Sequence, residues 1–284
     1  MEFIVDKQER LIKFLARNVQ GLSYANLQKS LRLGKVKVNG KRVKENILLN
    51  EGDKVFIFIV KKNMPQIEIV YKDDNLLIVN KPAGIECALK DKSSNSAYSL
   101  EEIFAQEGAI VVHRLDRLTE GLTILARNKQ TAECFDRFFK EHRIEKKYLA
   151  CVNGILKDEG KKVAYLKKNP KTGFVKISLT PKPDYKEIIT EFKVKNTFDK
   201  YSILDITLHT GRTHQIRAYF SFLGNNVVGD TKYSSLKNEI TNDYKGYFLT
   251  AYHLKFNLPN QFSYLNNLEF NIVPTWLKYT YKFN

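Results

Sequence analysis

The spacing of apolar residues changes character several times along the chain, and it predicts both helices and strands. Between Lys129 and His142 apolar side chains recur at helical spacing, and the buried side of that helix is expected to consist of Cys134, Phe135, Phe138 and Phe139. A second helix is expected at Thr213–Leu223, after a glycine turn. Strand-like segments are Ile67–Tyr71, Leu76–Asn80, Tyr148–Val152, Glu191–Val194 and Tyr201–Leu208. This irregular order indicates an α+β fold rather than repeated βαβ units.

The first 62 residues carry a pattern of their own. Arg10–Leu15 starts one helical pattern, and Ser23 is placed to cap a second helix that ends near Gly34. Alternating valines then lead into Asn39-Gly40, a strong signal for a β-hairpin. Residues 61–66 interrupt two apolar runs and contain a proline, so they are the predicted linker. We therefore expect a small α/β domain at residues 1–62 and a larger domain at residues 67–284.

Composition and charge narrow the class of protein. The chain has 284 residues, of which 43% are hydrophobic, which is enough for a packed globular core. It carries 47 Lys and Arg against 31 Asp and Glu, a surplus of 16 positive charges that favours a polyanionic partner. Residues 1–62 alone hold 14 Lys or Arg and 6 Asp or Glu, which is half of this surplus. The basic density therefore lies mainly in the small domain.

Several classes of protein are disfavoured by what the sequence lacks. Cys87, Cys134 and Cys151 form no Cys-x-x-Cys pair, so neither a disulfide framework nor a zinc ribbon is expected, and a reducing cytoplasmic location fits best. No basic leader with a long apolar stretch opens the chain, and no apolar run reaches the roughly 18 residues of a membrane span. Histidine spacing matches no metal signature, and nucleotide-binding loops are missing. We expect a monomer without metal, cofactor or membrane contact.

The segment Val112–Leu122 holds the candidate chemistry. It places Asp116 between Arg114 and Arg117, just before what reads as a Thr-x-Gly turn. Neighbouring cations favour the ionised form of a carboxylate, so Asp116 is the candidate nucleophile. An isolated Arg-x-Asp-Arg is more often a surface ion pair. Three further segments shift the balance towards catalysis: Asn80–Gly84, Lys146–Gly154 and Leu208–Arg217.

Together these segments resemble the RluA family of pseudouridine synthases. Its pattern of His-Arg-Leu-Asp, Lys-x-Tyr-x-Ala and Thr-Gly-Arg-x-His-Gln-Ile-Arg appears here in the family's order, followed by Gly229-Asp230-x-x-Tyr233. Glu120 stands where the family usually has serine, which adds a negative charge near Asp116. The resemblance implies an isomerase that acts on RNA without a cofactor. It also implies a catalytic domain built on a long, bent, mostly antiparallel mixed sheet with flanking helices, and an active cleft across that sheet.

The resemblance also suggests roles for particular residues. Asp116 attacks the ribose or removes its 2′ proton, and the sequence leaves both routes open. Arg217 is the preferred partner for the charge of Asp116, with Arg212 as the second choice. Tyr148 stacks on a flipped-out uracil and relays the proton from C5. Further candidates for substrate binding are Arg114, His113, Lys81 and Arg212. The last three rank behind Arg114, and each is expected either to be structural or to face a phosphate.

The small domain resembles the S-four RNA-binding module. The resemblance lies in the order of two helices, Gly-x-Val-x-Val-Asn-Gly and Gly52-Asp53-x-Val55. Positive side chains on the second helix and the following turn are expected to contact phosphates, which positions RNA without reading its sequence. These residues are Lys29, Arg32, Lys35, Lys37, Lys41 and Arg42.

If the protein is an enzyme, the S-four-like module in the small domain indicates which RNA is its substrate. Family members that carry such a module mostly resemble enzymes of the large ribosomal subunit, so large-subunit ribosomal RNA is the favoured partner. Two alternatives stay open: a pseudouridine synthase acting on transfer RNA, and a non-catalytic RNA-binding factor for ribosome assembly.

Overall fold

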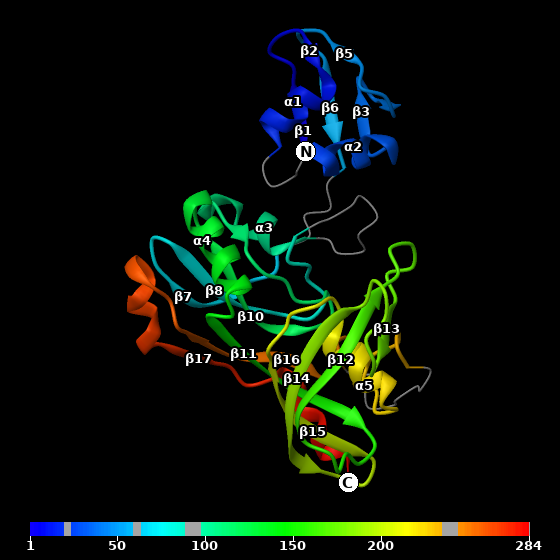
Figure 1. Cartoon of the computed structure of the whole chain (residues 1–284). Helices are drawn as coiled ribbons and strands as arrows, with labels where there is room; N and C mark the ends of the chain where they lie inside the picture. Colours follow the sequence, from blue (N-terminus) through cyan, green and yellow to red (C-terminus); the bar gives the residue numbers. More distant parts are fainter. Residues whose placement is uncertain (20–23, 59–63, 89–97, 235–243, 284) are drawn as a thin grey trace. The chain divides into compact units, whose positions relative to one another are not determined.

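The computed structural model describes residues 1–19, 24–58, 64–88, 98–234 and 244–283. The expected helix cap Ser23 and residues 61–63 of the expected linker lie outside these ranges. The chain divides into two compact units, Met1–Met64 and Pro65–Asn284 (Figure 1). Each unit has its own hydrophobic core, so each is described by itself.

The N-terminal unit packs two helices on a small antiparallel sheet. Helices α1 (Leu11–Asn18) and α2 (Tyr24–Arg32) share a buried core with that sheet. The strand order is β1 (Glu2–Ile4), β6 (Lys54–Ile57), β3 (Val36–Val38) and β4 (Lys41–Val43), with a separate short pair of β2 (Glu9–Arg10) and β5 (Leu48–Leu49). Asn39 and Gly40 both have positive φ, as a two-residue hairpin turn requires. The predicted hairpin is confirmed.

An eleven-stranded sheet forms the frame of the C-terminal unit. Its main path runs β13-β12-β14-β15-β11-β16-β10-β8-β7, with β9 added to β10 and β17 added to β16. In chain order the strands are β7 (Glu68–Lys72), β8 (Leu76–Lys81), β9 (Ile110–Val111), β10 (Glu120–Ala126), β11 (Ile144–Asn153), β12 (Gly160–Lys168), β13 (Val175–Ser178), β14 (Lys186–Thr197), β15 (Tyr201–Leu208), β16 (Leu249–Phe256) and β17 (Glu269–Asn271). Among these pairs, β10 with β16 runs parallel and the others run antiparallel.

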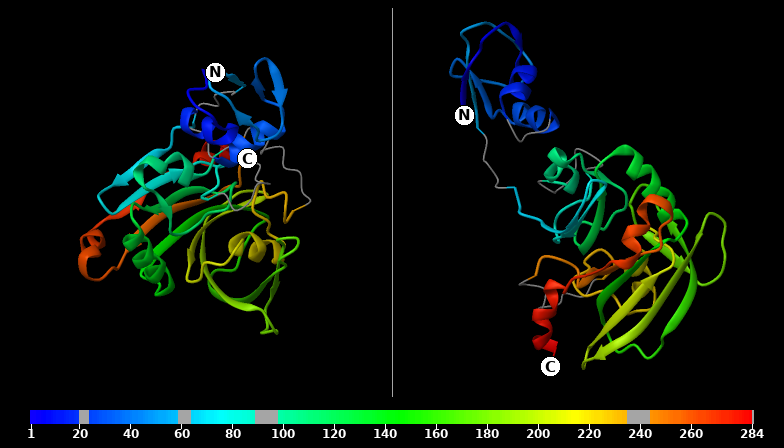
Figure 2. Two further views of the ribbon diagram at one scale, coloured as in Figure 1. Left: turned by 90° about the horizontal axis from the view of Figure 1, so that it is seen from above. Right: turned by 90° about the vertical axis from the view of Figure 1, so that its left-hand side faces the viewer.

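This sheet confirms the predicted fold class. The strands β12 to β15 curve away from the half that carries β7, β8 and β10 (Figures 1 and 2). The helical elements of this unit are α3 (Leu100–Ile103), η1 (Ala105–Glu107), α4 (Lys129–Lys140), α5 (Gln215–Phe222), η3 (Asn260–Asn267) and η4 (Thr275–Phe283). The predicted strands and both predicted helices of this unit are present, but two strands are much longer than predicted. Strand β14 spans Lys186–Thr197 and not only Glu191–Val194, and β11 begins at Ile144 and not at Tyr148.

Helix α4 covers the half of the sheet formed by β8 and β10. It begins where expected because Asn128 caps it, accepting a hydrogen bond from the Thr131 amide at 2.8 Å. Phe135 and Phe138 are fully buried against apolar residues of β8 and β10. Cys134 and Phe139 are partly buried and pack against the same core, so the expected apolar side of the helix faces the sheet.

The expected Thr-x-Gly turn after Asp116 is wrong. The turn lies earlier, at Arg117 and Leu118, and strand β10 already begins at Glu120. Gly121 has a φ of +128°, and a Cβ atom there would lie 2.4 Å from the carbonyl oxygen of Ala251 on β16. The glycine therefore allows two strands to approach closely, rather than allowing the chain to turn.

Glu120 is a buried structural residue. Its side chain accepts hydrogen bonds from the Tyr244 hydroxyl at 2.9 Å, the Thr250 hydroxyl at 2.7 Å and the Thr275 amide at 2.8 Å. The residue is 3% exposed, and these donors compensate for burying its charge. Glu120, which stands where the family usually has serine, thus joins the C-terminal segment around Thr275 to the start of β10.

Two further observations concern the chain as a whole. Cys87, Cys134 and Cys151 are all free thiols. Within the described ranges, none of the helices is long and apolar enough to cross a membrane.

Candidate active site

Asp116 lies on the loop between β9 and β10, and backbone contacts fix this loop on several sides. The Leu115 amide donates to the sulfur of Cys87 at 3.3 Å, and the Thr119 amide donates to the Asp116 carbonyl at 3.0 Å. The Tyr247 amide, from the segment before β16, donates to the Leu118 carbonyl at 2.9 Å. Local residues and a distant segment thus hold the loop in one conformation.

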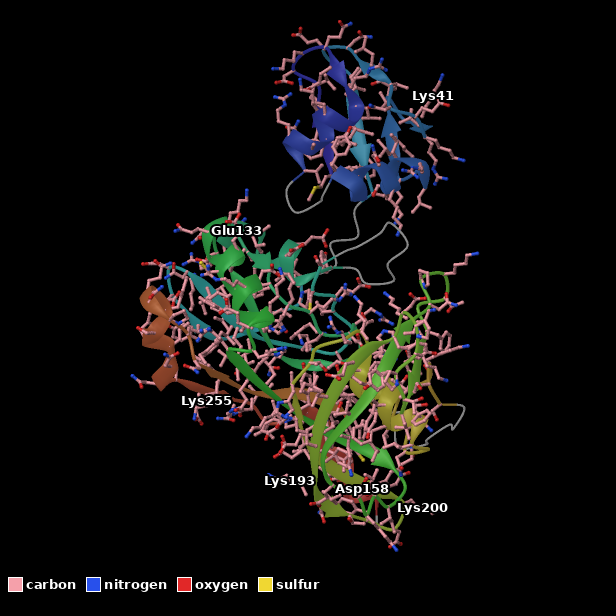
Figure 3. All side chains as sticks on the ribbon, in the orientation of Figure 1. Lys41, Glu133, Asp158, Lys193, Lys200 and Lys255 are labelled. Atoms are coloured by element: carbon pink, nitrogen blue, oxygen red, sulfur yellow. The ribbon has the colours of Figure 1, made fainter. Side chains whose placement is uncertain are left out.

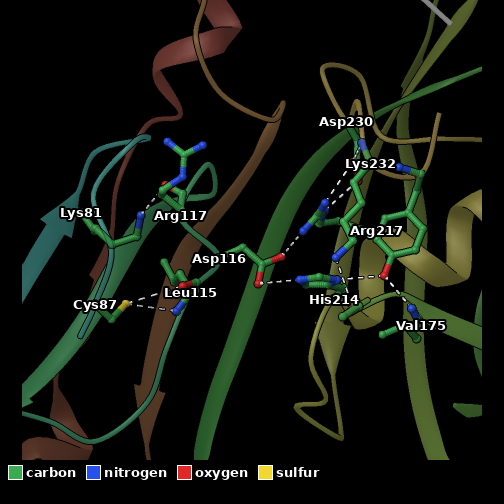
Figure 4. A network of polar contacts seen from close by, with 12 residues as sticks. Lys81, Cys87, Leu115, Asp116, Arg117, Val175, His214, Arg217, Asp230 and Lys232 are labelled. Atoms are coloured by element: carbon green, nitrogen blue, oxygen red, sulfur yellow. Dashed lines mark hydrogen bonds and ion pairs between the residues drawn. The ribbon is translucent and has the colours of Figure 1, made fainter. Parts of the chain in front are cut away.

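Lys81 anchors the same loop from inside the protein. Its side chain is fully buried, and its Nζ donates to the carbonyl oxygens of Pro82 at 3.1 Å, Ile85 at 2.8 Å and Arg117 at 3.2 Å. Burial lowers the pKa of Lys81 to about 8. Lys81 was a substrate-binding candidate with either a structural or a phosphate-facing role, and its ammonium has the structural one, because it donates to backbone carbonyls beside Asp116 (Figure 4).

Asp116 and Arg217 form an ion pair across 101 positions of sequence. The Arg217 Nη1 donates to Oδ2 of Asp116 at 2.6 Å (Figure 4). The other edge of the guanidinium binds Asp230 through two bonds, from Nε at 2.7 Å and from Nη2 at 3.0 Å. One guanidinium therefore orients two carboxylates, and Arg217 rather than Arg212 is the partner of Asp116.

The environment of Arg217 is closed. The residue is 3% exposed, and its guanidinium carbon lies 4.1 Å from the ring centroid of Tyr247 and 5.2 Å from that of Tyr233. Burial by itself would lower the pKa of Arg217, but hydrogen bonds to Asp230 and the charge of Asp116 outweigh burial and raise that pKa. The side chain of Asp116 is 22% exposed, whereas those of Arg217 and Asp230 are almost fully buried. Of the two carboxylates, the accessible one is therefore the candidate nucleophile.

Two cavities meet at Asp116. Both are lined by Arg114, Leu115, Asp116, His214 and Arg217. The first cavity also has Tyr148 and Arg212 in its wall, whereas the second has residues such as Arg117, Lys232 and Tyr247. The carboxylate therefore faces a site lined by two tyrosines, Tyr148 and Tyr247, and by several cations.

Tyr148 reaches the first cavity from β11. The pairing of β11 with β16 shifts register between Lys147 and Tyr148, and such irregularities re-aim side chains. Tyr148 is 7% exposed, and burial, together with the charge of Asp116, raises its pKa well above the ordinary value. The phenol therefore keeps its proton near neutral pH and presents a flat face with a hydroxyl group.

The turn before α5 presents Arg212. Gln215 is buried, and its Oε1 accepts from the Thr210 hydroxyl and from the Arg212 amide, both at 3.0 Å. Its amide nitrogen donates to the Thr190 hydroxyl at 3.1 Å. These bonds fix the Thr-Gly-Arg turn, and Arg212 and Arg114 are the exposed cations at the cavity wall.

His113 is placed away from this site, although it was a candidate for substrate binding. Its Nε2 accepts a hydrogen bond from the Ile124 amide at 2.9 Å, and its ring packs on Phe139 with centroids 4.8 Å apart. Burial and the nearby charge of Lys146 lower the pKa of His113 to about 3. The ring lines neither cavity and supports the start of the Asp116 loop.

Sequence reasoning missed four residues of this site. Asp230, Tyr233, His214 and Tyr247 all contact or face the Asp116–Arg217 pair. The motif Gly229-Asp230-x-x-Tyr233 was visible and could have suggested a role for Asp230. No local sequence pattern indicates that Tyr247 packs on Arg217, because its position depends on the path of the chain into β16.

The basic residues of the N-terminal unit are mostly free at its surface. Lys29, Arg32, Lys35, Lys41 and Arg42 are exposed, and Figure 3 shows Lys41 pointing outward. Lys37 is half-buried, with its ammonium 5.8 Å from the ring centroid of the exposed Phe58. The part of the chain that the structure describes contains no cluster of three His, Cys, Asp or Glu side chains suited to a metal ion.

Comparisons with known proteins agree on one family. Residues 75–222 match the family model described as RNA pseudouridylate synthase. The chain is 32% identical to an uncharacterized RNA pseudouridine synthase of Mycoplasma capricolum, with 97% of this chain and 98% of that protein covered. It is 31% identical to the ribosomal large subunit pseudouridine synthase C of Buchnera aphidicola, with 81% and 79% covered.

A solved structure supports the same fold. The human protein RNA pseudouridylate synthase domain containing 4 superposes with a TM-score of 0.61 over 76% of this chain and 92% of that one, at 18% sequence identity.

Proposed function

The chain belongs to the RNA pseudouridylate synthase family, and we propose that it isomerises specific uridines of large-subunit ribosomal RNA with Asp116 as the catalytic carboxylate. The activity class is that of an isomerase acting on RNA. The choice of ribosomal RNA is supported by similarity to the large-subunit synthase C proteins of Buchnera aphidicola and Vibrio cholerae. A basic N-terminal unit agrees with a large folded RNA as substrate.

One observation carries the assignment of Asp116. Oδ2 of Asp116 accepts a hydrogen bond from Arg217, and Asp116 lines two cavities whose walls carry several cations and, in the first cavity, Tyr148. The guanidinium stabilises negative charge on the acid and also fixes its plane. An ionised, oriented and partly open carboxylate is the group that this isomerisation needs.

The reaction needs no external electrons. The bond between ribose C1′ and uracil N1 breaks, and its electron pair leaves with the base. Asp116 either adds to C1′ or removes the proton from C2′, and both routes require the ionised carboxylate. The base then turns and C5 bonds to C1′, which either displaces Asp116 from C1′ or is accompanied by return of the proton from Asp116 to C2′. C5 finally loses its proton, and N1, no longer bonded to the sugar, gains one. The atoms of uridine and pseudouridine therefore balance.

Tyr148 and the surface arginines fill the remaining roles. Because the pKa of Tyr148 is raised, its ring and its protonated hydroxyl favour stacking and hydrogen bonding over acting as the base that starts proton transfer. A uridine must leave its stack to reach Asp116, which costs a few kcal/mol. Arg114 and Arg212 are exposed at the cavity wall, so they are placed to grip flanking phosphates and offset this cost.

The N-terminal unit is proposed to be an S-four-like RNA-binding domain, with the part after the linker as the catalytic domain. The order of helix, helix and hairpin in the N-terminal unit supports this assignment, as does the exposure of five of the six candidate cations in that unit. These cations would contact phosphates and increase the residence of RNA near the catalytic unit.

The substrate is tested by mapping pseudouridines in cells with and without the gene, using a carbodiimide that blocks reverse transcription at each one. We expect one or a few stops in large-subunit ribosomal RNA to disappear without the gene and to return with the wild-type copy. An Asp116→Asn copy should not restore them. Loss of stops in transfer RNA alone would overturn the ribosomal assignment, and unchanged stops in all RNA would favour a non-catalytic binding factor.

A further inference from the structure

His214 sits at the centre of the site in an unusual backbone conformation. It precedes α5 with φ +55° and ψ +23°, in the left-handed region that is uncommon for residues other than glycine. Its side chain is 15% exposed and lines both cavities at Asp116. The ring nitrogen Nε2 lies 3.8 Å from Oδ1 of Asp116, which is the oxygen that Arg217 leaves open (Figure 4).

The hydrogen bonds of Tyr233 indicate which nitrogen of His214 carries the proton. The Val175 amide donates to the Tyr233 hydroxyl oxygen at 3.0 Å. That oxygen lies 2.8 Å from Nδ1 of His214. Since the hydroxyl oxygen already accepts one bond, its own hydrogen is best used by donation to Nδ1. A neutral ring that accepts at Nδ1 must carry its proton on Nε2, on the side of Asp116.

The charge state of the ring is consistent with this tautomer. Burial lowers the pKa of His214 to about 4. The facing charges act in both directions: Asp116 and Asp230 raise this pKa, whereas Arg217 and Lys232 lower it. His214 is therefore neutral near pH 7 and offers one N–H group to the site.

We propose that His214 is a positioning residue whose Nε2–H, set by Tyr233, holds Oδ1 of Asp116 while Arg217 holds Oδ2. This rests on the proposed function of Asp116. The present distance of 3.8 Å exceeds a hydrogen bond, and such contacts commonly tighten when substrate binds. Oδ1 has two lone pairs, so one stays available for the ribose. A carboxylate held at both oxygens cannot rotate out of line with the sugar.

Two substitutions at one position separate this role from a purely structural one. His214→Asn suits the left-handed backbone, but its amide nitrogen reaches only the place of Nδ1. His214→Gln fits the backbone less well, but its amide nitrogen reaches the place of Nε2 and can donate to Asp116. A backbone role therefore predicts that asparagine is the better replacement, and a positioning role predicts that glutamine is.

The measurement is single-turnover release of tritium from RNA labelled at C5 of uridine, with saturating full-length enzyme and with thermal unfolding of each variant as a check on folding. We expect His214→Gln to retain most of the rate and His214→Asn to lose about 100-fold, the cost of a misplacement near 1 Å. RNA affinity should be equal for both. An asparagine variant as fast as the glutamine variant, or faster, would overturn the proposal.

A second measurement observes the protonation of His214 directly. In the wild type, ¹⁵N NMR of His214 should show an unprotonated Nδ1 and a protonated Nε2, and Tyr233→Phe should reduce that preference. A protonated Nδ1 in the wild type would contradict the inference. A wild-type enzyme that releases no tritium would refute the proposed function itself, whereas an active wild type with two equally active variants would refute the role of His214 alone.

Discussion

At the residue scale, the central feature is one cation shared by two carboxylates. Asp116, Arg217 and Asp230 together carry one net negative charge, and Arg217 is almost fully buried. The charge of Arg217 is therefore paired with the two carboxylates inside the protein. Arg114 and Arg212 are exposed instead, and we propose that they contact RNA phosphates, a role that the buried Arg217 cannot take.

Removing Arg217 should affect folding as well as activity. Arg217→Ala leaves Asp230 buried without its partner, so we expect the free energy of unfolding to fall by about 3–5 kcal/mol. Urea denaturation measures this value. The matched control is Arg212→Ala, which removes an exposed guanidinium at the same cavity and should change stability by less than about 0.5 kcal/mol. Equal effects of the two substitutions would contradict the shared-cation arrangement.

His113 should make stability depend on pH below neutrality. Its pKa is about 3 in the folded protein and 6.5 as the reference value, so between these pH values the unfolded chain binds more protons. Stability is thus fully present above pH 6.5 and lost as pH falls, by up to about 1.4 kcal/mol per pH unit. We expect His113→Gln to flatten this slope by about one proton between pH 6 and pH 4. A slope identical to the wild type would show that His113 does not titrate as described.

Residue roles could be predicted from the sequence only where a motif carried them. The sequence favoured Arg217 over Arg212 as the partner of Asp116, and the structure shows that pair. His113 belongs to the same motif as Asp116 but was grouped with the substrate contacts, because a motif does not reveal which way a ring points. The packing of Tyr247 on Arg217 depends on long-range chain path and left no local signal.

At the scale of elements, the close approach of β10 and β16 determines where Asp116 lies. The parallel pairing of Glu120 with Thr250 and of Gly121 with Ala251 sets the distance between these strands. The loop that carries Asp116 ends at Glu120, and the segment that carries Tyr247 leads into β16. One strand contact thus brings both sides of the site together.

Gly121→Ala should disrupt this contact. The new Cβ would meet the backbone of Ala251 at 2.4 Å, in addition to the strain of a positive φ. Gly160→Ala is the matched control, because Gly160 also has a positive φ (+96°) but has nothing within 4 Å of a Cβ. We expect the control to lose about 1–3 kcal/mol from strain alone and Gly121→Ala to lose clearly more. Chemical denaturation of both variants gives the comparison, and equal losses would mean that the strands can move apart at little cost.

Elements with strong local signals were predictable, and elements defined by partners were not. The hairpin at Asn39-Gly40 and helix α4 follow from turn chemistry, capping and helical spacing. The first two residues of strand β10, Glu120 and Gly121, were taken for part of a Thr-x-Gly turn, although all seven residues of the strand are buried. The parallel pairing with β16 decides that outcome, and no local pattern encodes it.

At the scale of the whole molecule, the charge distribution predicts how RNA binding responds to salt. Each phosphate contact by a Lys or Arg adds about one unit to the slope of log affinity against log salt concentration. Replacing the six candidate cations of the N-terminal unit by glutamine in the full chain should therefore reduce the slope by up to about six. These are Lys29, Arg32, Lys35, Lys37, Lys41 and Arg42.

The comparison for this experiment is a variant with exposed lysines of the catalytic unit replaced instead, at Lys193, Lys200 and Lys255 (Figure 3). Filter binding over a range of salt concentrations gives both slopes. A smaller change per residue in the N-terminal unit than in the control would contradict its assignment as the RNA-binding domain.

The most direct test of the whole account is tritium release from C5-labelled uridine in ribosomal RNA by the wild type and by Asp116→Asn, which preserves the size of the side chain and removes its charge. We expect release by the wild type without added metal or cofactor, and no release above background by Asp116→Asn despite unchanged RNA affinity. Release by Asp116→Asn at the wild-type rate would contradict it.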